Sequence, residues 1–204
     1  LFLVDASAAG VSVKSYKTMD GQRAATVTLA NVVVAEDQLL NAVGEGMDLV
    51  DQVMPSMLMA LSAEALGIMA TLNSITVGYS KTRQQFGSPI GSFQVLQHRM
   101  VDTFMSCEQA KSMLYRSLCQ ANDCAADASA DTGEFMKSVH ALKVTMAKAG
   151  KQIGEEAIQM HGGIGLTDEL NIGHFVKRLM TINVTLGDRD FHQKKFNQLS
   201  YSAS

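Results

Sequence analysis

The sequence predicts a mainly α-helical protein, an up-and-down four-helix bundle preceded by a few β-strands. Residues typical of strands, chiefly valine and threonine, are concentrated in about the first 40 positions. From about Gly46 onward, apolar residues recur at the spacing of an amphipathic helix. Segments rich in glycine, proline or small residues divide this helical region into three long pieces and two shorter ones. Together these observations predict a helical bundle behind a short β segment.

Two runs in the N-terminal region predict strands. Residues 1–4 are apolar, and residues 25–34 are rich in valine and threonine with partial alternation. The Asp20-Gly21 pair between them favours a hairpin turn. A few short strands cannot bury both faces of a sheet, so residues 1–44 are interpreted as the C-terminal remnant of a larger β domain. Because the chain also begins inside an apolar run, we expect it to be a fragment.

Residues 45–204 are predicted to form the helical domain. Asp131, followed by Glu134 at the spacing of a capping box, marks the start of the third helix. Ser92, after the turn at residues 87–89, is the expected N-cap of the second helix. The expected helices are residues 46–78, from Ser92 to a small-residue connector at 122–130, from Asp131 to about 160, and two shorter ones at 168–180 and 188–200.

The composition excludes several classes of partner. A net charge of −3 with intermixed signs offers no basic surface for nucleic acid. The three cysteines lack Cys-x-x-Cys spacing and leave one over, which argues against a zinc site or a secreted disulfide framework and favours a reducing, cytoplasmic setting. The most apolar window, residues 53–72, contains Pro55 and Glu64, so we expect a buried amphipathic helix and no membrane span.

Two motifs carry candidate binding chemistry. The first, R-x-x-F-G-x-P-I-x-x-F-Q-x-x-Q, contains Arg83, Phe86 and Gln94. An arginine fork suits a pyrophosphate, an aromatic ring can cover an adenine, and a glutamine can bond to either. The same residues could instead be a helix-end cation, a core anchor and a surface glutamine. The second motif, Q-x-x-G-G-x-G from Gln159 to Gly165, would let backbone N–H groups approach a ligand, although glycines also commonly end a helix.

Read together, these motifs, which lie about 65 residues apart, resemble those of the acyl-CoA dehydrogenase family. The resemblance covers the whole chain: residues 30–34 look like the last strand of the family's middle β domain, and residues after about 45 look like its C-terminal four-helix domain. It implies FAD bound between the β domain of one subunit and the C-terminal domain of its neighbour. It also implies a homo- or hetero-oligomer built as a dimer of dimers, with an acyl-CoA or related small molecule as substrate.

Roles for individual residues follow from the motif match. The resemblance implies that Arg83 meets the FAD pyrophosphate, and that Phe86 and Gln94 meet the adenosine and pyrophosphate portion. It implies that Gln159, with Gly162 and Gly163, meets the adenine end of a cofactor held by the facing subunit. His161 lies in the same turn, where it is either a titratable group beside phosphates or an ordinary turn residue.

The catalytic end departs from the family pattern. The resemblance implies a general-base glutamate about 24 residues beyond the first glycine of the pair, where this chain has Leu186, which cannot remove a proton. Some members place the base on the first helix of the domain, where this chain has Met57 beside Leu58. The weak candidates that remain are Glu64, which could be a base or a helix–helix hydrogen-bonding residue, and Asp188, which could be a base or a helix cap.

The favoured function is that of an acyl-CoA dehydrogenase-like flavoprotein, which oxidises the α,β C–C bond of an acyl-CoA with FAD. One alternative is a non-catalytic, FAD-binding scaffold subunit of a hetero-oligomeric acyl-CoA dehydrogenase. A second alternative is a flavin monooxygenase of the same fold, which needs no α-proton base. We expect the isolated 204 residues to be inactive and not to retain FAD, because half a cofactor site must still offset the cost of fixing the ligand.

Overall fold

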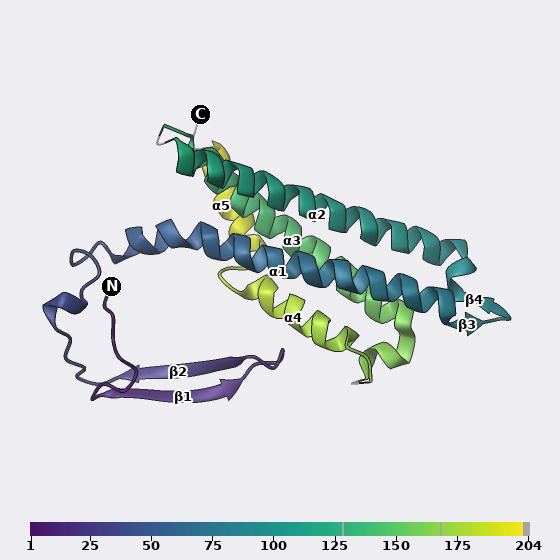
Figure 1. Cartoon of the computed structure of the whole chain (residues 1–204), viewed down its shortest axis with the longest axis horizontal. Helices are drawn as coiled ribbons and strands as arrows, with labels where there is room; N and C mark the ends of the chain where they lie inside the picture. Colours follow the sequence, from purple (N-terminus) through teal and green to yellow (C-terminus); the bar gives the residue numbers. More distant parts are fainter. Residues whose placement is uncertain (128, 168, 202–204) are drawn as a thin grey trace. The chain divides into compact units, whose positions relative to one another are not determined.

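The computed structural model describes residues 1–127, 129–167 and 169–201. The chain forms two compact units, Leu1–Ser56 and Met57–Ser204. Helix α1 (Gly46–Thr82) begins in the first unit and continues into the second. Figure 1 labels the elements along the chain.

The first unit contains a β-hairpin. Strand β1 (Val11–Lys17) pairs antiparallel with β2 (Arg23–Leu29), so that Val11 faces Leu29 across the ladder. The turn closes with a 2.9 Å bond from the Thr18 N–H to the Gln22 carbonyl, and Gly21 has a φ of +79°. Thr18 also bonds through its hydroxyl to Asp20. The hairpin predicted at Asp20-Gly21 is therefore confirmed.

The other predicted strands are wrong in extent. Within residues 1–4, only Phe2 forms a β-bridge, to Leu39. The second strand ends at Leu29, because Asn31 takes a φ of +52° that breaks the extended backbone. Residues 30–34, which resembled a last strand of the β domain, consequently form no strand.

The second unit is the predicted helical bundle. Helix α3 (Thr132–His161) packs against α2 (Gln94–Ala126), α4 (Ile172–Val184) and α5 (Arg189–Tyr201), and α1 contributes to the same core. Cys107 and Leu114 on α2, and Leu142 and Ile153 on α3, are among its buried residues. The mainly helical fold with a few strands is confirmed. After α1 the elements are β3 (Gln84–Gln85), β4 (Ser88–Pro89), α2 (Gln94–Ala126), α3 (Thr132–His161), α4 (Ile172–Val184) and α5 (Arg189–Tyr201), with short 3-10 helices at Glu36–Gln38, Ile90–Ser92 and Gly162–Leu166.

Several helix ends differ from the predicted ones. Helix α1 was predicted to end near Gly78 but continues to Thr82. Gly78 lies inside the helix on an open surface, where an added Cβ would meet nothing within 4 Å. Ser92 is not an N-cap, because its hydroxyl donates to the Pro89 carbonyl at 2.7 Å. Helix α2 continues through residues 122–126, which were predicted to belong to the connector. Helix α4 begins at Ile172 instead of 168, a position that lies outside the described residues.

The cap of α3 is confirmed. The Asp131 carboxylate accepts hydrogen bonds from the backbone N–H groups of Gly133 and Glu134. The reciprocal half of the capping box is absent among the described residues, since the Glu134 carboxylate pairs with Lys137 at 2.6 Å. One acceptor at the N-cap position is enough to satisfy two of the exposed N–H groups at the start of a helix.

Helix α1 is the one helix in the described part of the chain that is long and apolar enough to cross a membrane. Its Leu58, Met69 and Leu72 are completely buried in the helical unit. Those contacts are of the kind that a core helix makes in a helical bundle.

Candidate functional site

The segment between α4 and α5 is a sharp left-handed corner at the position where the family resemblance implies a base. Leu186 has a φ of +59° and Gly187 a φ of +104°. Asp188 then caps α5, because its carboxylate accepts the Phe191 N–H at 2.8 Å and its carbonyl accepts the His192 N–H at 3.1 Å. Asp188 therefore has the cap role that the sequence offered as an alternative to a base.

Two buried histidines hold this corner from inside the bundle. His192 on α5 places its Nε2 3.0 Å from the Leu186 carbonyl oxygen, and its Nδ1 lies 2.9 Å from Nδ1 of His140 on α3. A carbonyl oxygen can only accept, so His192 carries its proton on Nε2 and accepts at Nδ1 from the N–H of His140. His192 is accordingly neutral in this arrangement, and His140 is the donor.

Burial keeps these rings neutral. Desolvation is the main cause that lowers the pKa of His140 from 6.5 to about 4, and positive charge on His192 and Lys195 adds to it. Desolvation also lowers the pKa of His192, while the hydrogen bond to Leu186 acts in the opposite direction. Both imidazole rings are therefore uncharged at neutral pH.

Lys143 secures the end of α4 that leads into the corner. It is 1% exposed, and its ammonium donates to the carbonyl oxygens of Ile182 and Thr185, the second at 2.9 Å. These carbonyls belong to the last turn of α4 and the residue after it, where the helix itself supplies no donor. Burial lowers the pKa of Lys143 from 10.5 to about 8.

The first binding motif forms an exposed loop between α1 and α2. Phe86 and Gly87 both have positive φ, +52° and +78°, as the two central residues of a tight hairpin turn require. The ring of Phe86 is 92% exposed and meets Phe93 edge-on, with 6.3 Å between ring centroids. Phe86 is thus not a core anchor. Arg83 and Gln94 are also exposed, at the two ends of this loop.

The second motif ends α3. Gly162 has a φ of +66°, and its N–H donates to the carbonyls of Ile158 and Gln159. Added Cβ atoms at Gly162 and Gly163 would meet nothing within 4 Å, so both glycines lie on open surface. The side chain of Gln159 is exposed as well. This turn is a helix stop and also an accessible stretch of backbone.

His161 links the two motifs. Its ring stacks on Tyr79 of α1 with 4.4 Å between ring centroids, and its Nδ1 donates to the Ala157 carbonyl at 2.7 Å. Because Tyr79 lies in the last turn of α1, just before the Arg83 loop, and His161 directly precedes Gly162, the stack brings both motifs to one end of the bundle (Figure 1). His161 is 4% exposed and therefore a packed residue of the turn.

The Leu186 corner lies away from that end. Helix α4 runs back along the bundle for 13 residues before it reaches the corner, which is roughly 20 Å of helix. The structure therefore groups Arg83, Phe86 and Gln94 in one loop near the glycine turn, and places Leu186 and Asp188 at a separate point.

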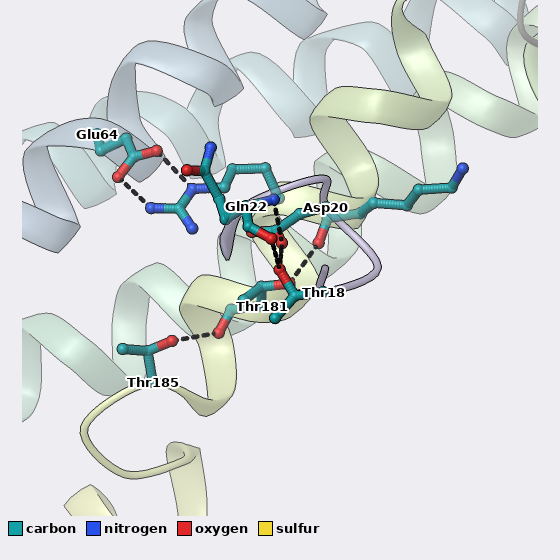
Figure 2. Close-up of polar contacts among 8 residues, drawn as sticks. Thr18, Asp20, Gln22, Glu64, Thr181 and Thr185 are labelled. Carbon is teal, nitrogen blue, oxygen red and sulfur yellow. Dashed lines mark hydrogen bonds and ion pairs between the residues drawn. The ribbon is translucent and has the colours of Figure 1, made fainter. Parts of the chain in front are cut away.

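Glu64 is a helix–helix pairing residue. Its two carboxylate oxygens accept from Nε and Nη2 of Arg178 on α4, at 2.6 and 2.8 Å, and Figure 2 shows the two contacts on the Glu64 carboxylate. Of the other first-helix positions, Leu58 is fully buried and Met57 is 46% exposed. The geometry favours the helix–helix alternative for Glu64 over a general base.

We expect Glu64→Gln to lower the free energy of unfolding by less than about 1 kcal/mol, because the carboxylate is 43% exposed and water screens the pair. Urea denaturation would measure the change, with Glu155→Gln as the control for a surface pair, since Glu155 lies 3.9 Å from Lys151. A loss of several kcal/mol would contradict a screened pair.

Comparison with known proteins identifies the family to which this chain belongs. A sequence model of the family described as "Acyl-CoA dehydrogenase, C-terminal domain" matches residues 44–195, which is well over half of the chain. The chain belongs to the acyl-CoA dehydrogenase family. The resemblance drawn from the two motifs is thereby confirmed.

Individual proteins that are similar to this chain include acyl-CoA dehydrogenases. Acyl-CoA dehydrogenase IpdE2 of Mycolicibacterium smegmatis is 36% identical over 118 residues, which are 58% of this chain and 34% of that protein. The structure of the Tcur3481-Tcur3483 steroid ACAD is 27% identical, with a TM-score of 0.81 over 100% of this chain and 52% of that one. The FAD complex of PigA is 25% identical, with a TM-score of 0.86 over 98% of this chain and 51% of that one.

This chain spans about a third of that curated relative and about half of the two solved chains. Sequence reasoning missed the residues that hold its Leu186 corner, namely His140, Lys143 and His192. One signal was present: Lys143 lies one residue after Leu142, and His140 one residue after Val139, so polar side chains interrupt the apolar face of α3.

Proposed function

We propose that this chain is part of an FAD-dependent acyl-CoA dehydrogenase in which it supplies cofactor-binding surface while a homologous subunit supplies the proton-abstracting carboxylate. The observation that carries the proposal is the chemistry of the corner. Leu186 cannot accept the α-proton of an acyl-CoA. The two carboxylates that the sequence offered instead have other partners: Asp188 caps α5, and Glu64 pairs with Arg178.

The exposed residues at the β3–β4 end fit FAD. Arg83 offers a guanidinium fork for the pyrophosphate, and the solvent-exposed ring of Phe86 offers a flat apolar face for the adenosine portion. Gln94, exposed at the start of α2, offers an amide to the same portion. Gln159, Gly162 and Gly163 offer accessible backbone and an amide for the adenine end of a cofactor held by a facing subunit. FAD bound there would supply the acceptor for the hydride that leaves the β-carbon. The FAD complex of the relative PigA supports this assignment.

A partner subunit accounts for the missing base. The α-proton must pass to an ionised group close to the substrate, and the corner that would present such a group in this chain carries an aliphatic side chain. The name of the related Tcur3481-Tcur3483 structure joins two proteins, which supports an assembly of unlike subunits. In such an assembly this chain binds and orients cofactor, and the other chain moves the proton.

Purification of the native protein from its source tests this proposal. We expect mass spectrometry to find a homologous second subunit with a glutamate at the position equivalent to Leu186. The flavin absorbance of the complex should bleach on addition of one member of an acyl-CoA series. A homo-oligomer that bleaches with an acyl-CoA would contradict the division of labour, and a flavin that no acyl-CoA bleaches would contradict dehydrogenation.

Replacement of Arg83 tests the cofactor-binding role directly. Arg83→Met in the native complex should weaken FAD retention about 10- to 100-fold, the range expected for loss of a charge-assisted bidentate contact. Equilibrium dialysis with flavin fluorescence would measure the dissociation constant. Arg116→Met, which removes another exposed arginine from the far part of α2, should leave the constant unchanged. Equal retention in both variants would show that Arg83 does not contact FAD.

A further inference from the structure

The helical unit contains a cavity of about 250 Å³ between α1, α3 and α4. An engineered apolar cavity of about 150 Å³ is large enough to bind benzene, so this one has room for a larger molecule. Its wall is mostly apolar. The apolar and small residues that line it include Ala65, Met146, Gly150, Gly154, Val176 and Leu179.

Two polar atoms in the wall have no hydrogen-bond partner among the described residues. They are Oγ of Ser62 on α1 and Oδ1 of Asn183 on α4. Ser62 is 1% exposed. A helical serine ordinarily donates to a carbonyl of the preceding turn, and buried polar groups in native proteins are nearly always paired. These groups therefore point to a polar ligand group inside the cavity.

Lys143 adds a positive charge to the same wall. Its ammonium has three N–H groups, and two of them are used by the carbonyls of Ile182 and Thr185. Burial alone lowers its pKa to about 8, with no carboxylate acting in the opposite direction. No described residue supplies a counter-ion for this buried charge, which is an unfavourable state that an anionic ligand would relieve.

Other charged groups near the cavity do not neutralise Lys143. From α3, Lys151 and Glu155 line the cavity and lie 3.9 Å from one another, and both are about two-thirds exposed. The residues that α1 and α4 contribute to the wall are uncharged. On the α5 side, His192 interacts electrostatically with Lys143 and with Asp188, which caps α5.

We propose that this cavity binds a small apolar monocarboxylate, with its hydrocarbon part among the apolar residues and its carboxylate on Lys143 and Ser62. The carboxylate supplies the missing counter-charge and accepts the Ser62 hydroxyl. Asn183 presents its amide to the same group once its N–H₂ points inward, an orientation that side-chain amides adopt according to their partners. A thioester carries no negative charge at its carbonyl, so this site selects free acids over acyl thioesters.

Titration calorimetry on the 204-residue chain, without FAD or acyl-CoA, tests the site with hexanoate and its neutral counterpart hexanamide. Hexanoate should bind with a sub-millimolar dissociation constant at pH 7, and hexanamide at least 10-fold more weakly. Ser62→Ala should weaken hexanoate binding several-fold. Ser117→Ala is the matched control, because Ser117 is equally buried but its hydroxyl is already bonded to the Met113 carbonyl. Equal binding of the two ligands, or no binding, would overturn the proposal.

Proton linkage tests whether Lys143 is the partner of the anion without replacing Lys143. This matters because Lys143→Met would remove two buried hydrogen bonds and can fail to fold. A bound carboxylate favours the charged lysine, so binding at pH 9, above the pKa of about 8, should take up close to one proton. Binding at pH 6 should take up none. Titrations in buffers of different ionisation enthalpy measure this number, and Lys151→Gln should leave it unchanged. An uptake of zero at pH 9 would overturn the assignment of Lys143 as the partner of the carboxylate.

The calorimetric assay contains no flavin, so its outcome is independent of the proposed dehydrogenase function.

Discussion

Gly187→Ala is expected to lower the free energy of unfolding by roughly 2–4 kcal/mol. Gly187 has a φ of +104°, where an L side chain is strained. A Cβ there would lie 2.5 Å from Cδ1 of Phe191 and 2.9 Å from Nε2 of His192. The Phe191 ring can turn toward solvent, but His192 is buried and donates through that nitrogen to Leu186. Relief of the contact would therefore break the bond that holds the corner.

Urea denaturation followed by circular dichroism measures this change. Gly87→Ala is the control for strain without a clash, because Gly87 also has a positive φ but an added Cβ meets nothing within 4 Å. That control should cost about 1 kcal/mol. If the two variants lose the same stability, the contacts at Gly187 relax freely and the corner is not rigid.

Acid is expected to destabilise the helical unit through the His140–His192 pair. The pKa of His140 is depressed in the folded state, from 6.5 to about 4. Between these values the unfolded chain binds more protons than the native one, so stability is fully present above pH 6.5 and is lost as the pH falls toward 4. The loss should be about 2 kcal/mol after allowance for screening by nearby water. Lys143 and Lys195 add to it, since both are positive charges near the rings.

A comparison of unfolding free energies at pH 7 and pH 4.5 checks this expectation. His140→Gln should be less stable than the parent at pH 7, because the hydrogen bond to His192 is altered, but its stability should change less between the two pH values. His98→Gln, which replaces an exposed histidine on α2, should keep the pH dependence of the parent. The same pH dependence in all three proteins would assign the acid sensitivity to other groups.

The local features of this chain follow from its sequence. The Asp20-Gly21 turn, the Asp131 cap and the glycine stop after His161 each depend on hydrogen bonds and backbone angles within a few residues. The long helices follow from an apolar period that is read over several turns. The two motifs, each set by residue identity and spacing, were enough to indicate the family. Helix ends were predicted less well: α1 continues past Gly78, and the Ser92 hydroxyl bonds to the Pro89 carbonyl instead of capping α2.

The tertiary structure alone decided which polar groups meet. Glu64 and Arg178 lie 114 residues apart, His140 and His192 lie 52 apart, and Lys143 reaches a carbonyl 39 residues away. Helical periodicity shows that such residues share a face with apolar ones, but not which helix packs on that face or at what depth. The cavity beside Lys143 also depends on how closely α3 and α4 approach at Gly150 and Gly154. Local preferences are set by near neighbours along the chain, whereas burial, pKa and partner choice are set by packing between helices.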